Sequence, residues 1–298
     1  MSRPLWLLAA PVIFLILWSA GFSVAKIGLH HVPPMTLLAL RYLLAVALLL
    51  PAALVLRPPL PRSRRAFFDV AVTGFLIQVV YFGLCYLSFR AGTPAGTVAI
   101  IVCLQPILVA LIAPGWVGER IGATRWLGLG LGLLGAGAVI WSRQGVGAAS
   151  AFGLLTAGGG LLGITGGTLY EKRYGVSQHP LTANLIQYGV GALFTLPLAL
   201  LMERFQVDWG WELTWVMAYL VVGNSLIAIT LLLALIRVGE VSRVSSLFYL
   251  VPPLAALFAW PMLGEVMAPM GWAGMAVAAA GVALVARPVR RDAPKGAR

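Results

Sequence analysis

Long apolar stretches separated by short polar ones recur along the whole chain, and none shows the sustained alternation of a barrel strand. A helix that crosses a hydrocarbon layer of about 30 Å needs about 20 apolar residues. Ten stretches approach or exceed that length: residues 5–25, 36–56, 67–89, 94–113, 125–141, 149–170, 181–202, 213–236, 241–263 and 271–286. The pattern predicts an all-α polytopic membrane protein with ten transmembrane helices and no separate soluble domain.

Composition supports this reading. The 298 residues are 60% hydrophobic and 10% charged, with a mean hydropathy of +0.94, whereas soluble domains average about 45–50% apolar and about 25% charged residues. These values exclude an ordinary cytosolic enzyme, a disordered chain and a disulfide-stapled secreted domain. The first stretch is longer than the roughly 7–15 residues of a signal-peptide core, so we expect a retained span.

The net charge of +12 is read as a topology signal rather than as a nucleic-acid footprint, because the basic residues lie between the apolar stretches. In a ten-span chain, one end carries Lys26, Arg90, Arg143 and Arg204, Arg41 lies within the second span, and 16 of the 21 basic residues lie at the other end. Basic residues favour the cytoplasmic side. We therefore expect both termini in the cytoplasm and the chain in the inner (plasma) membrane.

The two halves of the chain resemble each other. Residues that recur at a spacing of 146 or 147 are Lys26 and Lys172, Tyr42 and Tyr188, Pro51 and Pro197, Gln78 and Asn224, Arg90 and Arg237, Gly92 and Gly239, Pro106 and Pro253, Gly118-Glu119 and Gly264-Glu265, and Trp126 and Trp272. We expect one membrane domain (1–298) built of two five-helix repeats, 1–144 and 145–298. An odd number of spans inverts the second repeat, as in many secondary transporters with a substrate site at the repeat interface. A merely structural bundle is the alternative.

The same residues carry a resemblance. The repeated Gly-Glu ahead of a Gly-rich span, the in-span Pro106 and Pro253, Pro34 with Arg41, and the stretch from Trp18 to Phe22 followed by Lys26 resemble the EamA-type branch of the drug/metabolite transporter superfamily. The likeness covers essentially the whole chain. It implies a ten-helix metabolite exporter, similar to family members that move aromatic amino acids.

Polar and aromatic side chains inside the spans are candidate substrate-binding groups, because buried polar groups in a membrane face a cavity or another helix. The candidates are Trp18, Phe22, Gln78, Tyr81, Thr165, Asn224, Ser245 and Tyr249. Packing offers an alternative for each of them. An amide can join neighbouring helices, an aromatic ring can face lipid, and a hydroxyl can bond back to its own helix.

Candidate gate and hinge residues are Lys26, Lys172, Pro106 and Pro253. The lysines end the first helix of each repeat and could instead snorkel to headgroups, while each proline could mark a static bend. The Gly-rich fifth and tenth spans favour close packing within one chain, with a homodimer surface as the alternative. A monomer is favoured.

The nine acidic residues lie at span ends or in loops, so no carboxylate marks a proton path inside the membrane. This favours a facilitator or an exchanger. The middle of the spans is expected to lack a strong fixed charge, which suits a zwitterion. No spacing indicates a metal, a cofactor or a catalytic pair. The sequence therefore favours an exporter of small metabolites, most of all aromatic or bulky apolar amino acids. A channel, a structural protein and an exporter of drugs or other metabolites remain alternatives.

Overall fold

The computed structural model describes residues 6–93, 98, 101–119, 121–142, 150–175, 178–239, 241–251, 253–255, 257–258 and 269–286, and the regular structure within these ranges is entirely helical. The helices are α1 (Trp6–Gly28), α2 (Pro34–Leu56), α3 (Arg64–Gly74), η1 (Phe75–Tyr81), α4 (Phe82–Arg90), α6 (Gln105–Trp116), α7 (Ala123–Ser142), α8 (Ala151–Tyr174), α9 (Pro180–Met202), α10 (Trp211–Ala218), η2 (Tyr219–Ile229), α11 (Thr230–Val238), α12 (Val241–Ser246), η3 (Leu247–Leu250) and α14 (Pro269–Ala286).

Six helical rods are long and apolar enough to cross a membrane: α1, α2, α3–η1–α4, α8, α9 and α10–η2–α11. Their bounds agree with the predicted spans to within a few residues. The fourth and ninth predicted spans include residues outside the described ranges. The second Gly-Glu pair, Gly264 and Glu265, also lies outside them. The chain is therefore a helical membrane protein.

Local sequence signals explain where several helices begin. Ser63 and Ser150 accept hydrogen bonds from the backbone amides of Ala66 and Gly153, which caps α3 and α8. Proline opens both α2 and α9, at Pro34 and Pro180, where its missing N–H costs nothing.

Two of the rods contain π-helical segments. In the rod from α3 to α4 the π segment is η1, and in the rod from α10 to α11 it is η2. The widened turns of a π segment shift the helix register and often mark functional sites. Gln78 in η1 and Asn224 in η2 are counterparts at the spacing of 146, so the two irregular segments occupy corresponding positions.

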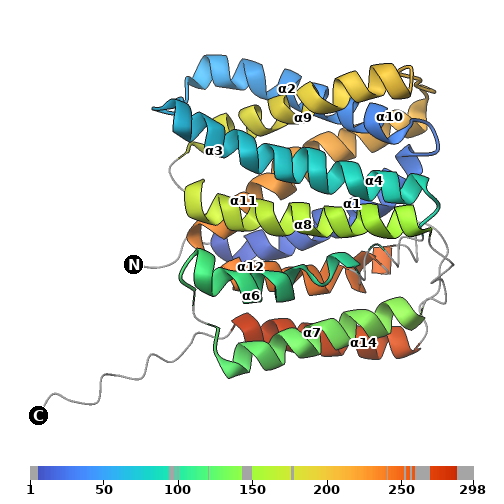
Figure 1. Cartoon of the computed structure of the whole chain (residues 1–298). Helices are drawn as coiled ribbons and strands as arrows, with labels where there is room; N and C mark the ends of the chain where they lie inside the picture. The colour runs from blue at the N-terminus through green and yellow to red at the C-terminus, as the bar shows by residue number, and fades with distance from the viewer. Residues whose placement is uncertain are drawn as a thin grey trace, which may run out of the picture.

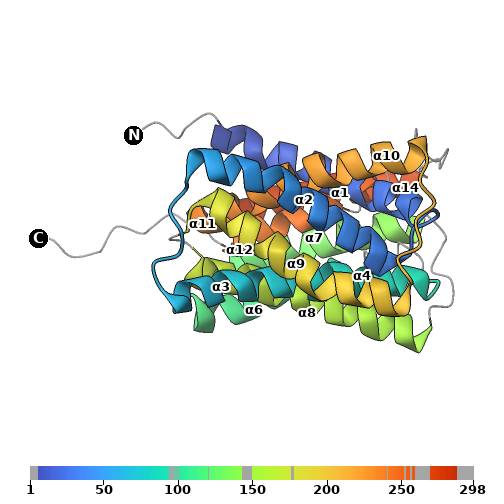
Figure 2. The same ribbon diagram turned by 90° about the horizontal axis from the view of Figure 1, so that it is seen from above.

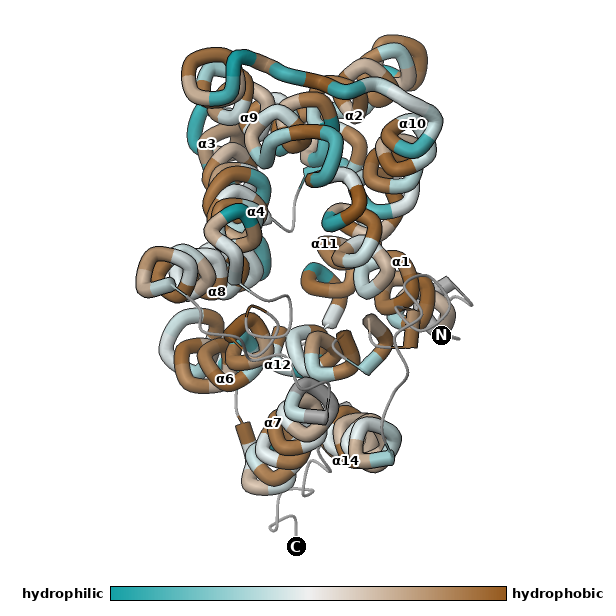
Figure 3. Tube along the Cα trace, turned by 90° about the vertical axis from the view of Figure 1, so that its right-hand side faces the viewer, coloured by the Kyte–Doolittle hydropathy of each residue, from teal (hydrophilic) through white to brown (hydrophobic). Residues whose placement is uncertain are grey.

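The helices run nearly parallel or antiparallel to a common axis (Figures 1 and 2). Viewed along that axis, α2 and α9 lie at one edge and α7 and α14 at the opposite edge (Figure 3). Between them, α4 and α8 line one side and α1 and α11 the other, with α6 and α12 below. The interior is therefore bounded by helices from both halves of the sequence.

Glycines bring α7 and α14 into close contact. A Cβ atom added at Gly135 would lie 2.5 Å from the carbonyl oxygen of Gly274, and one added at Gly281 would lie 2.6 Å from the carbonyl oxygen of Gly128. These two faces therefore pack against each other within the chain. Gly130 and Gly137 on α7 face open space instead.

Large apolar side chains cover the outer faces of the bundle, including Leu134, Leu155, Leu162 and Leu193, each at least 65% exposed. Such a surface would aggregate in water and is stable against lipid tails. Exposed tryptophans lie near helix ends, among them Trp116, Trp141 and Trp211. Their placement is typical of the membrane–water interface.

Candidate functional site

A small cavity lies in the middle of the bundle, and residues from both halves line it. Its walls are Trp18, Gly21, Phe22 and Ala25 of α1, Arg41 of α2, Tyr81 of η1, Phe82, Cys85, Tyr86 and Phe89 of α4, and Asn224 of η2. We call this space the central cavity. Its volume of about 20 Å³ holds roughly one water molecule, so side chains must move before a solute can enter.

Aromatic rings form most of the wall. The Trp18 indole stacks on Tyr81 with ring centroids 6.1 Å apart and an angle of 9° between the planes. It also packs on Phe82 at 5.8 Å and, edge to face, on Phe248 at 5.6 Å. Phe248 belongs to η3 in the second half of the sequence. The candidates Trp18, Phe22 and Tyr81 are therefore brought together at one site.

Arg41 corrects one expectation from the sequence, which placed no strong fixed charge in the middle of the spans. Its side chain is completely buried, with Nε donating to Ser225 Oγ at 2.6 Å and Nη2 donating to Asn224 Oδ1 at 2.7 Å. The guanidinium also lies over the Phe82 ring, 4.5 Å from its centroid. These neutral partners stabilise a buried cation that hydropathy alone could not place.

Asn224 joins three helices at the cavity. While its Oδ1 accepts from Arg41 of α2, its Nδ2 donates to the Leu17 carbonyl oxygen of α1 at 3.3 Å. The amide reaches α1 because residue 21 is glycine: a Cβ there would lie 2.2 Å from Asn224 Nδ2. Gly21 thus makes room for the network around Arg41.

Gln78, the counterpart of Asn224, lies outside the central cavity. Its side chain is fully buried in η1, and neither amide atom has a hydrogen-bond partner among the described residues. The nearby Gln187 of α9 is in the same situation. The backbone carbonyl oxygen of Gln78 accepts from the Tyr42 hydroxyl at 2.7 Å. The structure therefore places this amide between helices, away from the aromatic wall.

The three hydroxyl candidates also lie outside the central cavity. Thr165 donates to the Leu161 carbonyl oxygen of its own helix at 2.7 Å. Ser245 accepts from Gln105 Nε2 at 3.3 Å. Tyr249 is fully buried and packs at Gly132 of α7. All three residues lie in helix packing around α6, α8 and α7.

Pro106 and Pro253 both adjoin breaks in regular helix. A turn at residues 103–104 precedes α6, so Pro106 lies in its first turn, and the 3₁₀ segment η3 ends three residues before Pro253. Both prolines are buried. Interrupted helices of this kind are found around the binding sites of secondary transporters.

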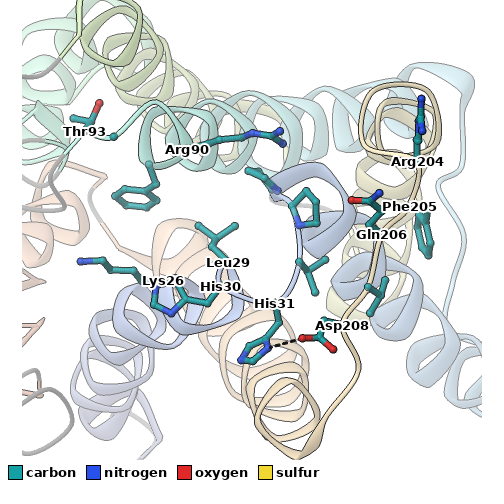
Figure 4. A pocket seen from close by; sticks show the side chains of 16 residues that line it. Lys26, Leu29, His30, His31, Arg90, Thr93, Arg204, Phe205, Gln206 and Asp208 are labelled. Carbon is teal, nitrogen blue, oxygen red and sulfur yellow. Dashed lines mark ion pairs between the residues drawn. The ribbon is translucent and has the colours of Figure 1, made fainter.

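A second and larger cavity opens at the end of the bundle where α1 ends. It measures about 1100 Å³ and is lined by the end of α1, the α1–α2 connection, the end of α4 and the α9–α10 connection. We call it the vestibule. Lys26, His30, Arg90, Arg204 and Asp208 surround it (Figure 4), so its wall is predominantly basic. Phe89 lines both the vestibule and the central cavity and thus lies between them.

Carboxylates tie the rim of the vestibule together. Glu203 accepts from the backbone amides of Met35 and Thr36, at 3.1 and 2.7 Å, and pairs with Arg90 at 3.2 Å. His31 contacts Glu212 at 3.0 Å and lies 3.8 Å from Asp208, the latter contact drawn in Figure 4. These contacts hold the α9–α10 connection to the beginning of α2 and the end of α4.

The opposite end of the bundle carries a compact polar cluster, which we call the latch: Glu171, Lys172 and Arg237. Arg237 Nε pairs with Glu171 Oε1 at 2.6 Å. Lys172 Nζ donates to the carbonyl oxygens of Arg237 and Gly239, at 3.2 and 2.6 Å. Lys172 therefore caps the end of α11, whereas its counterpart Lys26 is exposed in the vestibule.

The latch and the vestibule differ at one corresponding position. Lys172 and Arg237 correspond to Lys26 and Arg90, but the residue that corresponds to Glu171 is Ala25. Arg237 thus pairs with the residue before Lys172, whereas Arg90 pairs with Glu203 at the end of α9. Within the described residues, no group of three His, Cys, Asp or Glu side chains could hold a metal ion.

The fold and its cavities define a polytopic helical membrane protein with a solute-sized vestibule and an aromatic interior. The model of the EamA-like transporter family matches residues 4–141 and again residues 151–287. The chain belongs to the EamA-like transporter family, whose members are transporters and not enzymes.

Several curated relatives are similar over most of their length. An uncharacterized transporter, YvbV of Bacillus subtilis, is 27% identical over 91% of this chain and 88% of its own. A probable amino-acid metabolite efflux pump of Salmonella typhimurium is 27% identical over 95% and 94%. A probable terminal-alkyne amino-acid exporter of Streptantibioticus cattleyicolor is 28% identical over 96% and 94%. A solved crystal structure covers 93% of this chain and 95% of its own with a TM-score of 0.79, and its 19% identity shows likeness of fold alone.

Proposed function

We propose that this chain is a secondary transporter that exports amino acids with aromatic or bulky apolar side chains. The observation that carries the proposal is the central cavity, whose aromatic wall is built by α1 and α4 and whose polar corner joins α2 to η2. The relatives named as amino-acid exporters support the same substrate class. The walls offer ring faces for an apolar side chain and hydrogen-bond donors for a polar group.

The different states of the two ends support transport by alternating access. The vestibule is open, and the latch ties α8 to α11. A reversal of this arrangement would move Phe89 and the vestibule rim inward while the Glu171–Arg237 pair separates. The solute would then lose its access to the vestibule and gain access to an opening at the latch end.

Two inverted five-helix repeats, 1–144 and 145–298, provide the two bodies that move. The double family match supports this division, as do the corresponding π segments η1 and η2. The excess of basic residues at the latch end supports a cytoplasmic latch, cytoplasmic termini and an outward-facing vestibule. Among the described residues, the buried carboxylates Asp69, Glu171 and Glu203 lie near the ends of their helical rods. This favours facilitated export or exchange.

Counterflow in proteoliposomes tests the proposal. Vesicles loaded with unlabelled phenylalanine should take up labelled phenylalanine transiently, at a rate that saturates with concentration and depends on solute inside. Trp18→Ala should lower the rate with protein yield unchanged, because it removes the ring that contacts Tyr81, Phe82 and Phe248. Flux that rises linearly without saturation would support a channel, and absence of flux for every amino acid would contradict the proposal.

A further inference from the structure

The central cavity contains two buried nitrogen atoms without a partner. Among the lining residues that the structure describes, the buried polar atoms without a hydrogen bond are Trp18 Nε1 and Arg41 Nη1. Both are hydrogen-bond donors and neither can accept. Both side chains also flank the same ring, since Trp18 and Arg41 each pack on Phe82. The group that completes this cavity must therefore be an acceptor.

Charge narrows the choice of acceptor. Arg41 is completely buried, and the groups that interact with it, Asn224 Oδ1, Ser225 Oγ and the Tyr86 side chain, are neutral. Within the described part of the chain, no carboxylate lies at ion-pair distance from Arg41. A buried cation favours an anionic partner, and a guanidinium binds a carboxylate through charge-assisted hydrogen bonds. A solute with a carboxylate would supply the missing counter-charge.

We propose that Arg41 Nη1, assisted by Trp18 Nε1, binds the carboxylate of the transported solute, and that the solute is an apolar monocarboxylate whose amino group is dispensable. The inference rests on the proposed transport function and deepens it. Ser225 and Asn224 accept from Nε and Nη2, which leaves Nη1 available to the solute.

The dispensable amino group follows from the rest of the wall. The described lining holds aromatic rings, Cys85, Ala25 and Gly21 beside the arginine and the asparagine, and it offers no carboxylate to an ammonium group. A described lining with one cation, Arg41, and no anion therefore matches a solute with one carboxylate and no need of a charged amino group. The rings of Phe22, Phe82 and Tyr86 would contact the apolar part of the solute.

Competition on the unmodified protein tests the inference. In counterflow with labelled phenylalanine, unlabelled phenylalanine and phenylpropionate, which lacks the amine, should inhibit at similar concentrations. Phenylalaninamide, which lacks the carboxylate, should inhibit about tenfold or more weakly, as expected for loss of a charged hydrogen bond. Equal inhibition by the amide would overturn the inference and leave the transport proposal intact. Absence of counterflow with any solute would overturn both.

Variants locate the effect at Arg41. Arg41→Gln should abolish the discrimination between phenylalanine and its amide, while Arg41→Lys should retain a part of it because the charge remains. Arg64→Gln, at an exposed position at the start of α3, is the matched control and should discriminate as the parent does. A folded Arg41→Gln protein that still rejects the amide would exclude Arg41 as the carboxylate partner. Should that variant not fold, the competition series on the parent decides the substrate class.

Discussion

Tyr42 and Tyr188 stack on each other with ring centroids 5.8 Å apart, and each donates its hydroxyl to the π segment of its own half. Tyr42 binds the carbonyl oxygen of Gln78 in η1 at 2.7 Å, and Tyr188 binds that of Ser225 in η2 at 2.5 Å. The two tyrosines are counterparts at the spacing of 146, and their helices α2 and α9 pack together. The stack therefore links the two π segments through one pair of rings.

Loss of either the Tyr42 or the Tyr188 hydroxyl should lower the stability of the folded protein by a similar amount. Tyr42→Phe and Tyr188→Phe keep the stacked rings but remove one buried hydrogen bond each, worth about 1 kcal/mol. We expect both variants to show a lower apparent Tm in detergent. Tyr174→Phe is the control. It also removes one tyrosine hydroxyl, and it keeps the ring over which Arg173 lies. Unchanged Tm in both variants would contradict a stabilising role for the two bonds.

Gly21→Ala should disable the polar corner of the cavity. The new Cβ would lie 2.2 Å from Asn224 Nδ2, so the amide must move and the Arg41–Asn224 bond at 2.7 Å is lost. Since a hydrogen bond to a charged group contributes about 1.5–3 kcal/mol, we expect counterflow to slow by roughly tenfold or more. Gly130→Ala has open space around it and should transport as the parent does. Normal counterflow by Gly21→Ala would show that the network is dispensable.

Glu171→Gln should open the latch. Removing one partner of a buried ion pair costs about 3–5 kcal/mol, and here the loss falls on the latched state. Access can be followed at Cys85, which lines the central cavity, after Cys103→Ala removes the other thiol. We expect an impermeant maleimide added from the vestibule side to label Cys85 more slowly in the variant.

Arg62→Gln is the control for the latch. It removes an exposed charge from the α2–α3 connection at the same end of the bundle. Exposed charges contribute little to stability, so labelling of Cys85 should stay at the parent rate. Faster labelling of the Glu171→Gln protein from the vestibule side would argue against the latch.

Gly135→Leu should separate α7 from α14. The added side chain would meet the backbone of Gly274 and Ala278, with the Cβ atom alone 2.3 Å from the Ala278 nitrogen. Overpacking costs about 1–3 kcal/mol, and a backbone contact cannot yield easily. We expect a lower yield and a lower apparent Tm. A Cβ atom added at Gly137 on the same helix has no neighbour within 4 Å, so Gly137→Leu should leave both the yield and the Tm unchanged.

Neutralising the vestibule should change how solutes enter. Lys26→Gln with Arg204→Gln removes two exposed charges and leaves the Arg90–Glu203 pair in place. For an anionic solute presented on that side, KM should rise by up to about tenfold at low ionic strength. The difference should vanish near 1 M salt, where the screening length is about 3 Å. A KM that does not depend on salt in either protein would contradict electrostatic attraction.

Hydropathy predicted the helical membrane fold well, because spans such as α2 and α9 depend only on a long apolar run opened by proline. It could not predict η1 and η2. A π segment depends on packing partners such as the Tyr42 and Tyr188 hydroxyls, and the local sequence from Phe75 to Tyr81 does not differ from ordinary helix.

The candidate site was predicted only in part. Trp18 and Tyr81 were found because aromatic residues in mid-span are conspicuous, and Asn224 because amides there are rare. Arg41 was noted but not assigned to the site, since its partners, Asn224 and Ser225, lie more than 180 residues away along the chain. Thr165 and Ser245 cannot be distinguished from cavity hydroxyls by spacing. The structure shows that Thr165 donates to its own helix and that Ser245 accepts from Gln105 of α6.

Ala25 stands at the position in the first half of the chain that corresponds to Glu171 in the second half. The closed states of the two ends of the bundle are therefore not stabilised equally. The Glu171–Arg237 pair stabilises the protein while the latch is shut. Lys26 has no carboxylate before it that could form the corresponding pair when the vestibule is shut, and the Arg90–Glu203 pair is already formed with the vestibule open. Between turnovers the empty carrier would therefore rest with its vestibule open. In the proposed export cycle, released solute that accumulates on the vestibule side would rebind this resting form, so transport would be subject to trans-inhibition by its own product.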